Sequence, residues 1–388
     1  MFNKLANENF YRKFYFQDSF YAQCLDVNPL TMEQFDRSLE NVRKLMDLPI
    51  MKTANHVLAT GCGDSNIAAF ACREAFAHYL PDVDFEPVEA IELSRHYEFP
   101  EDCSHSMALF ISVSGGVFRT IEALRRCKRR NVCTVAITDS PASKTAQEAD
   151  IGFFENSPEG DNNAGLRTYY VNVISTMILA AAMAEARTCK PHLAQLREQV
   201  AKYHNAFFAR WEEIDTACFA AAVHFLDKKY LEVCGDGPMF WAGKFIQAKV
   251  MELSGDPCTV IDSENYMHVN GMMYPAADIG EIVLVNTNDA NVDRIVESTN
   301  AMLKSGREVL LMCDKTPDEI GVRGTVLYCP MPVPEKAWNF LASIYAYLPG
   351  SLFGGFRHTT LGEPMFRGGF DPTVFIPAYY APIEVIES

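Results

Sequence analysis

The distribution of apolar and polar positions predicts alternating strands and helices along the first half of the chain. Short apolar runs at residues 56–60, 107–113 and 132–138 are typical of strands buried in a parallel sheet. Stretches with apolar residues at helical spacing follow the first two runs, at 65–79 and 117–129. This alternation is typical of an α/β fold whose parallel sheet is flanked by helices. The other elements expected here are a lead helix near 31–46, a short strand around 151–154 and a long helix at about 167–186.

The second half of the chain repeats the alternation. Its expected elements are strands at 230–234, 281–286 and 309–313 and helices at 238–253 and 292–304. The two halves predict two similar α/β lobes, the first at 31–190 and the second at 213–348. The remaining segments are an N-terminal segment at 1–30, a helical linker at 191–212 and an aromatic, glycine-rich tail at 349–388 that packs on the body.

The composition and the net charge exclude several kinds of partner and cofactor. The chain has 388 residues and a formal net charge of −16, so we expect neither a nucleic acid nor an anionic membrane as a partner. The most apolar predicted helix, 171–186, is too short and too mixed to span a bilayer. The 12 cysteines are scattered without a CxxC pair, which is typical of free thiols in a reducing compartment. We therefore expect a cytoplasmic protein with neither a metal centre nor another cofactor.

Two glycine-rich turns, each between a predicted strand and a predicted helix, form the first candidate site. They read Thr-Gly-Cys-Gly-Asp-Ser at 60–65 and Ser-Val-Ser-Gly-Gly at 112–116. Such turns present backbone N–H groups that attract anions, and serine hydroxyls add donors. Two of them at neighbouring strand ends predict a phosphate site, although each alone is also typical of an ordinary helix cap. The candidate binding residues are Gly63, Asp64, Ser65, Ser112, Val113, Ser114 and Gly115.

Neither turn predicts a nucleotide site. No Gly-Lys-Ser/Thr follows either turn, and neither completes the pattern GxGxxG.

Two residues of the second half are candidates for proton transfer. Glu252 lies in the last turn of the helix predicted at 238–253, where the helix dipole disfavours an ionised carboxylate and favours an acid/base role. His268 follows sixteen positions later. A solvated surface glutamate and a structural histidine are the alternatives for these two positions.

Together these motifs resemble the double sugar-isomerase (SIS) domain family, over about residues 30–370. The family's Cys-Gly-x-Ser turn corresponds to 62–65 and its Ser-x-Ser-Gly loop to 112–115, while Glu252 and His268 reproduce its glutamate–histidine spacing. Its members include the isomerase half of glucosamine-6-phosphate synthase and the deglycases that act on phosphorylated fructosamines. The resemblance implies two tandem flavodoxin-like lobes and a tail that packs near the active site.

The resemblance also implies roles for the candidate residues. The two turns would bind a sugar phosphate, and Glu252 would move a proton between C1 and C2 of the open-chain sugar. His268 would reach the neighbouring subunit's site and assist ring opening or a second proton transfer. An obligate homodimer with shared active sites follows from that arrangement.

The sequence departs from the family pattern at the phosphate and sugar ends of the expected pocket. Val117 replaces a common threonine and removes a phosphate donor; Arg119 either compensates for it or faces solvent. Asn265 replaces the glutamate of the family's Glu-x-x-His-Gly-Pro, so we expect the sugar end of the pocket to differ.

The C-terminal tail favours the deglycases within the family. The synthase uses a tail lysine, whereas the last lysine here is Lys336. His358 and Arg367 are candidate substrate contacts, with surface or packing roles as the alternative. The first hypothesis is therefore a deglycase that converts a 6-phosphorylated fructosamine to an aldose 6-phosphate and an amine or amino acid. The alternatives are an aldose–ketose or amino-sugar-phosphate isomerase/deaminase and a non-catalytic sugar-phosphate sensor.

Overall fold

The computed structural model describes residues 19–157, 164–361 and 385, and these residues divide into two compact units. The first lobe consists of 29–157 and 165–198, and the second lobe consists of 19–28, 164 and 199–361. The divisions fall within two helices, α2 (Ser19–Arg43) and α10 (His192–Phe208).

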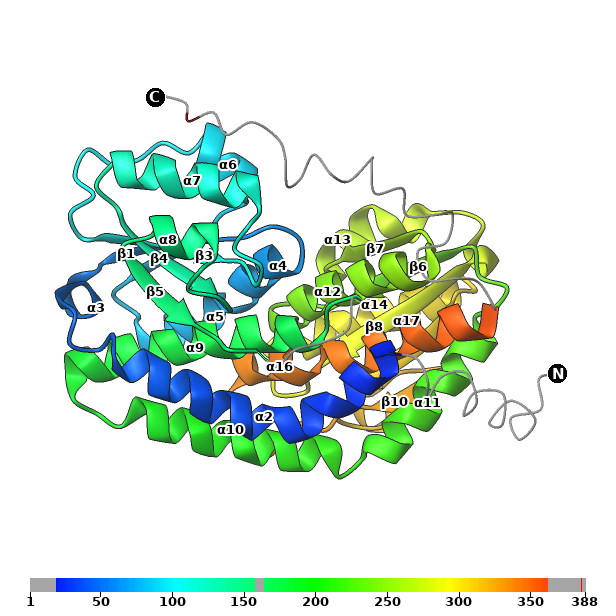
Figure 1. Cartoon of the computed structure of the whole chain (residues 1–388). Helices are drawn as coiled ribbons and strands as arrows, with labels where there is room; N and C mark the ends of the chain where they lie inside the picture. The colour runs from blue at the N-terminus through cyan, green and yellow to red at the C-terminus, as the bar shows by residue number, and fades with distance from the viewer. Residues whose placement is uncertain (1–18, 158–163, 362–384, 386–388) are drawn as a thin grey trace. The chain divides into compact units, whose positions relative to one another are not determined.

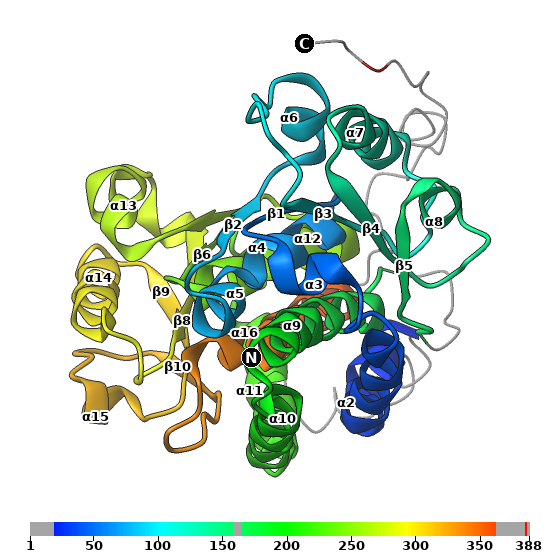
Figure 2. The same ribbon diagram turned by 90° about the vertical axis from the view of Figure 1, so that its left-hand side faces the viewer.

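The first lobe contains a five-stranded parallel sheet (Figure 1), with the strand order β2-β1-β3-β4-β5 (Figure 2). Its strands are β1 (His56–Thr60), β2 (Asp84–Pro87), β3 (Ser106–Ile111), β4 (Cys133–Thr138) and β5 (Ile151–Phe154). This is the flavodoxin-like strand order, in which the chain winds outward from β1 and β3.

Helices cover both faces of the first sheet (Figure 2). One layer consists of α3 (Pro49–Thr53), α4 (Asp64–Ala71), α5 (Arg73–Tyr79) and α9 (Arg167–Thr188). The other consists of α6 (Ala90–Arg95), α7 (Phe118–Arg129) and α8 (Lys144–Glu148). With both faces covered, β3 is buried along its whole length, which explains its continuous apolar run.

The second lobe repeats the same topology, with the strand order β10-β9-β8-β6-β7. Its strands are β6 (Tyr230–Cys234), β7 (Cys258–Ile261), β8 (Ile279–Val285), β9 (Glu308–Cys313) and β10 (Leu327–Pro330). Its helices are α11 (Trp211–His224), α12 (Pro238–Ser254), α13 (Ser263–His268), α14 (Val292–Lys304), α15 (Pro317–Ile320), α16 (Ala342–Tyr345) and α17 (Tyr347–Leu361). The predicted fold class, two tandem α/β lobes with flavodoxin-like sheets, is therefore confirmed.

Several element boundaries differ from the predicted ones. The lead helix expected near 31–46 begins at Ser19, because α2 continues through Pro29 instead of ending there. The linker expected at 191–212 is helix α10, and α11 begins at its end, at Trp211. The expected tail starts inside α17, whose Leu352, Phe353 and Phe356 are buried against α11 and α12.

The start of α2 contacts residues of the second lobe that are far from it in the chain. Tyr21 donates a hydrogen bond to Asp215, 194 positions away, with an O–O distance of 3.0 Å. Its ring also lies 6.3 Å from that of Phe356 on α17. Residues from both ends of the described chain therefore share one core.

Helix α9 is longer than the predicted apolar segment and is the one described helix that could cross a membrane by length and composition. However, 89% of its most apolar window is buried in the structure, which is typical of a core helix.

Candidate functional site

The turns after β1 and β3 lie at the carboxyl edge of the first sheet, where the chain changes its winding direction. The two strands are paired in parallel, with Leu58 opposite Ala108. Open α/β sheets bind ligands at this switch point. Both predicted turns therefore occur at the ligand-binding position of this type of sheet.

The turn at 112–116 is closed by its own hydrogen bonds. Gly115 N–H donates to the Ser112 carbonyl at 3.0 Å and to its hydroxyl at 3.1 Å. Thr145 holds the Gly115 carbonyl through its N–H and its hydroxyl, at 3.0 and 2.9 Å. The expectation of unpaired turn amides is therefore wrong at Gly115, because so short a turn satisfies this amide internally. Ser112 accepts this bond, so its own hydroxyl proton can still be donated to a ligand.

Gly115 is the position where this turn requires glycine. Its φ is +57°, and a Cβ there would lie 2.3 Å from the Ser143 hydroxyl oxygen. The close approach brings Ser143 and the start of α8 against the turn.

The first turn places Ser65 in the opening turn of α4. Gly63 precedes the helix with φ 58° and ψ −128°, and no side chain caps the helix there. The Ser65 hydroxyl lies 3.2 Å from the amide of Asn172 on α9. Cys62 contacts the Thr120 hydroxyl of α7 at 3.6 Å, which ties this turn to the helix that follows the other turn.

The departure at the phosphate end, Val117, and the nearby Arg119 now have structural positions. Val117 precedes α7 and provides no side-chain cap. Arg119 is ion-paired with the buried Glu122, which also pairs with Arg95. The positive charge of Arg119 is therefore paired with a carboxylate of the same helix, α7.

Lys144 is a basic residue near the turn that sequence reasoning missed. It follows Ser143 at the start of α8, and its ammonium lies 5.2 Å from the ring centre of Phe118, the first residue of α7. Its position after a third strand end, that of β4, was the available signal.

The second lobe positions Glu252 in the last turn of α12, as predicted, but with a partner that was not predicted. The Lys249 ammonium lies 2.6 Å from the Glu252 carboxylate, and the Lys249 side chain is fully buried while that of Glu252 is 38% exposed. The lysine favours the ionised carboxylate, against the effect of the helix end on which the prediction relied. This arrangement suits a carboxylate that accepts a proton.

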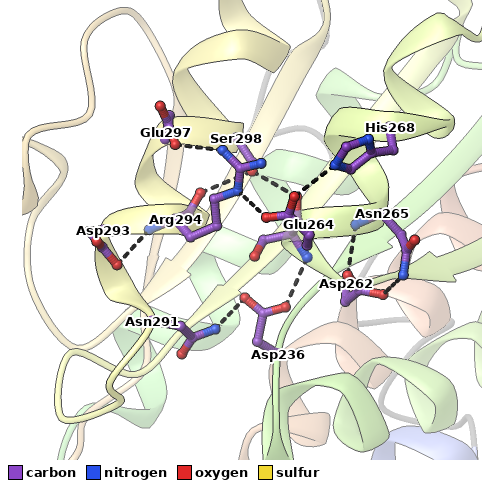
Figure 3. A network of polar contacts seen from close by, with 11 residues as sticks. Asp236, Asp262, Glu264, Asn265, His268, Asn291, Asp293, Arg294, Glu297 and Ser298 are labelled. Carbon is purple, nitrogen blue, oxygen red and sulfur yellow. Dashed lines mark hydrogen bonds and ion pairs between the residues drawn. The ribbon is translucent and has the colours of Figure 1, made fainter.

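His268 ends α13 on the surface of the second lobe (Figure 3), with its side chain 67% exposed. Its Nε2 lies 2.8 Å from Glu264, which also accepts a bond from Arg294 of α14 at 2.7 Å. The Arg294 and His268 contacts lower the pKa of Glu264. Glu252 and His268 thus have separate partners within this lobe.

Asn265 also belongs to this surface network and lies in the first turn of α13, whose N-cap is Asp262. Its N–H and side-chain amide both donate to Asp262, at 2.8 and 2.7 Å. The change that was expected to alter the sugar end of the pocket therefore stabilises the start of the helix that carries His268.

The loop after His268 is anchored by a buried charge cluster. Arg307 pairs with Glu281 and lies 3.3 Å from Glu232, and all three side chains are fully buried. It also donates to the carbonyl of Asn270 at 2.6 Å, while the Asn270 amide donates to Glu232. Burial, and then the charge of Glu232, raise the pKa of Glu281 to about 8. Sequence reasoning missed this cluster because its members are far apart in the chain.

The carboxyl edge of the second sheet is acidic. Asp236 accepts bonds from Ser263 N–H and from Asn291, and Asp289 lines the same small pocket. Burial, together with the charge of Asp236, raises the pKa of Asp289. The negative charges of this edge would repel an anion.

The tail candidates are only partly described. His358 falls within α17, Arg367 lies outside the described residues, and the structure leaves the contacts of both side chains untested. The neighbouring Arg357 is buried and pairs with Asp256 at 2.5 Å. Asp256 also accepts a bond from Ser254, so α17 holds the segment that follows Glu252.

The comparisons with known proteins agree with this geometry. Residues 50–182 match the family model of the SIS domain. A mouse protein named glutamine–fructose-6-phosphate aminotransferase [isomerizing] 2 is 30% identical over 143 residues, which cover 35% of this chain and 20% of that protein. The chain thus spans about a fifth of the length of this curated relative.

Two solved structures share the fold over most of the chain. The C-terminal domain of glucosamine-fructose-6-phosphate aminotransferase from Francisella tularensis has a TM-score of 0.79 at 18% identity, covering 92% of this chain and 99% of that one. Tagatose-6-phosphate ketose/aldose isomerase from Escherichia coli has a TM-score of 0.67 at 13% identity, covering 90% and 95%.

These findings define the first lobe as an α/β domain with two glycine-rich turns at the switch point of its sheet. Residues 50–182 match the SIS domain, which confirms the predicted family resemblance for this part of the chain.

Proposed function

We propose that the chain is an enzyme that moves a proton between C1 and C2 of a sugar phosphate. The observation that carries the proposal is the pair of hydroxyl-rich turns at the switch point of a SIS domain. Ser65, Ser112 and Ser114 bind the phosphate, and Lys144 adds a positive charge near the turn. The names of the relatives, which include isomerases of sugar phosphates, support this class of reaction.

Glu252 is the proposed base. A carboxylate must be ionised to accept a proton, and the contact with Lys249 favours that form. Its partial exposure leaves the carboxylate accessible to a substrate.

The finer proposal is a deglycase for a 6-phosphorylated fructosamine. Glu252 takes a proton from C1 of the ketoamine and a proton is returned to C2, while the C2 oxygen gains a proton and the nitrogen loses one. The C2 ketone thereby becomes an alcohol and the C1–N bond becomes an imine. Water then adds to the imine carbon, and the amine leaves with a proton to give the aldose 6-phosphate. An isomerase or deaminase of amino-sugar phosphates would use the same proton transfer, and the isomerase names of the structural neighbours favour it as the second candidate.

We also propose a homodimer in which His268 serves the neighbouring subunit. The support is the exposure of His268 together with that of the apolar side chains around it, Met267, Val269, Met272 and Tyr274. Light scattering of the purified chain tests this proposal, and a monomer at micromolar concentration would contradict it.

The activity is tested by an assay of glucose 6-phosphate release from a panel of phosphorylated fructosamines. We expect Glu252→Gln to lower kcat by about 10²–10⁴-fold, the usual effect of losing a positioned acid/base group. Glu213→Gln is the matched control, because Glu213 is also partly exposed and pairs with a basic residue three positions earlier, Arg210. Equal rates in the two variants would exclude Glu252 as the base. Binding of a sugar phosphate without turnover of any panel member would favour the isomerase, or a sensor.

A further inference from the structure

A buried carboxyl group lies behind the proposed phosphate site and is linked to Ser65 through one amide. Glu155 directly follows β5 and is fully buried, and Asn172 of α9 is also buried. One end of the Asn172 amide lies 2.9 and 3.2 Å from the two carboxyl oxygens of Glu155. Its other end lies 3.2 Å from the Ser65 hydroxyl oxygen.

The amide can satisfy these neighbours in two orientations. If Glu155 is ionised, the Asn172 NH₂ group must donate to the carboxylate, and its carbonyl oxygen accepts the Ser65 hydroxyl proton. If Glu155 is neutral, its O–H donates to the Asn172 oxygen, and the NH₂ group donates to Ser65. Only in the second orientation is the Ser65 hydroxyl proton available to a ligand.

The surroundings of Glu155 favour its neutral form. Burial and then the negative charge of Asp139 raise the pKa of Glu155 well above its usual range, and a hydrogen bond from Ser175 lowers it only in part. The other polar group packed on this residue is Gln34 of α2, whose amide donates to the Glu155 backbone carbonyl at 2.7 Å. Asp139 is thus the charged group acting on Glu155 within the described part of the lobe.

We propose that Glu155, Asn172 and Ser65 form a proton-dependent relay in which neutral Glu155 turns the Asn172 amide so that Ser65 donates to the bound phosphate. The proposal rests on the proposed function, because it takes 61–65 and 112–116 as the phosphate site. Glu155 and Asn172 are positioning residues in this relay, and Ser65 contacts the ligand. A neutral Glu155 also leaves no negative charge behind the bound anion.

The relay predicts that the contribution of Ser65 to binding depends on pH. With glucose 6-phosphate as the probe, calorimetric titration of the full chain would be carried out from pH 5.5 to 9 for the wild type and Ser65→Ala. At low pH the alanine variant should bind about tenfold more weakly, the usual effect of losing one hydrogen bond to a charged group. As pH rises through the pKa of Glu155, the ratio of the two affinities should fall towards one. Comparing the two proteins at each pH removes the phosphate's own titration near pH 6.

Glu155→Gln supplies the matching control. A glutamine N–H donates to Asn172 at every pH, so the Ser65 contribution in this background should stay at about tenfold throughout the range. A wild-type ratio that does not change with pH would overturn the relay and leave the phosphate site standing. A wild-type protein that binds no sugar phosphate would overturn the proposed function and the relay with it.

Discussion

The two lobes have the same backbone fold, but they carry different side chains at the carboxyl edge of the sheet. Gly63 and Gly237 both end a strand-to-helix turn, with φ 58° and ψ −128° in the first lobe and φ 53° and ψ −127° in the second. Two positions later the first lobe has the hydroxyl of Ser65, and the second has the apolar side chain of Met239. The backbone therefore repeats the same turn in both lobes, and the proposed anion site depends on the side chains that only the first lobe has.

The interiors of the two sheets also differ, but there the second lobe is the more polar one. Leu58 and Ala108 are paired across β1 and β3, whereas Glu232 and Glu281 are paired across β6 and β8. The first lobe thus has an apolar sheet beneath a polar edge. The second lobe buries carboxylates in its sheet, and Arg307 connects them to the loop that follows His268.

The largest expected effect is a loss of ligand affinity when the turn at 112–116 of the first lobe is altered. Gly115→Ala should weaken the binding of glucose 6-phosphate about hundredfold, because a Cβ would collide with Ser143 and displace the donors at Ser112 and Ser114. Calorimetric titration measures this change. Gly237→Ala is the control: it also places a side chain at a positive φ, 53° compared with 57° at Gly115, and should lower stability but leave the affinity unchanged. Equal losses of affinity in both variants would remove the distinction between the lobes.

The next effect concerns the buried carboxylates of the second lobe. The pKa of Glu281 is raised to about 8, so its neutral form is favoured in the folded state. The stability it contributes is fully present below the unfolded pKa, about 4.3, and is lost as pH rises through 8. Glu281→Gln should therefore raise the free energy of unfolding at pH 9 relative to the wild type, by about 2 kcal/mol, and flatten its decline with pH.

Urea unfolding at several pH values would test this prediction. Glu297→Gln, on the exposed face of α14, is the control and should follow the wild-type curve. A Glu281→Gln protein whose stability falls with pH as steeply as that of the wild type would assign the decline to other groups.

The smallest effect is expected from the basic residue beside the turn. Lys144→Gln should weaken glucose 6-phosphate binding about fivefold, since an exposed charge pair contributes up to about 1 kcal/mol, and the loss should shrink at high salt. Lys315, which is exposed just after β9 in the second lobe, supplies the control Lys315→Gln. A loss of affinity in the control alone would place the anion at the second lobe.

The sequence was informative where the determinants are local. Glycine turns next to apolar runs located the switch point of the first lobe, and the position of Glu252 in the last turn of α12 was also predicted. The edge strand β5 was predicted, but the edge strands β2, β7 and β10 were missed. Of these, β2 contains Asp84, Glu86 and Pro87, residues that are uncommon in strands.

The residues that contact Glu252 and Ser65 were also missed, in one case because the helical spacing was not used and in the other because the contact depends on tertiary packing. Lys249 lies one helical turn from Glu252 and could have been found from spacing alone. Glu155 and Asn172 meet Ser65 only when β5 and α9 pack beside α4, so their role depends on tertiary structure.

The contact of Tyr21 with Asp215 and Phe356 has a consequence for synthesis of the protein. The chain leaves the ribosome from its N-terminus, so residues 29–198 of the first lobe are complete while most of the second is still missing. The apolar face at the start of α2 therefore stays uncovered until α11, and finally α17, has been synthesised. During that interval it is a surface to which chaperones can bind, and translation that stops before α17 should yield an aggregation-prone product.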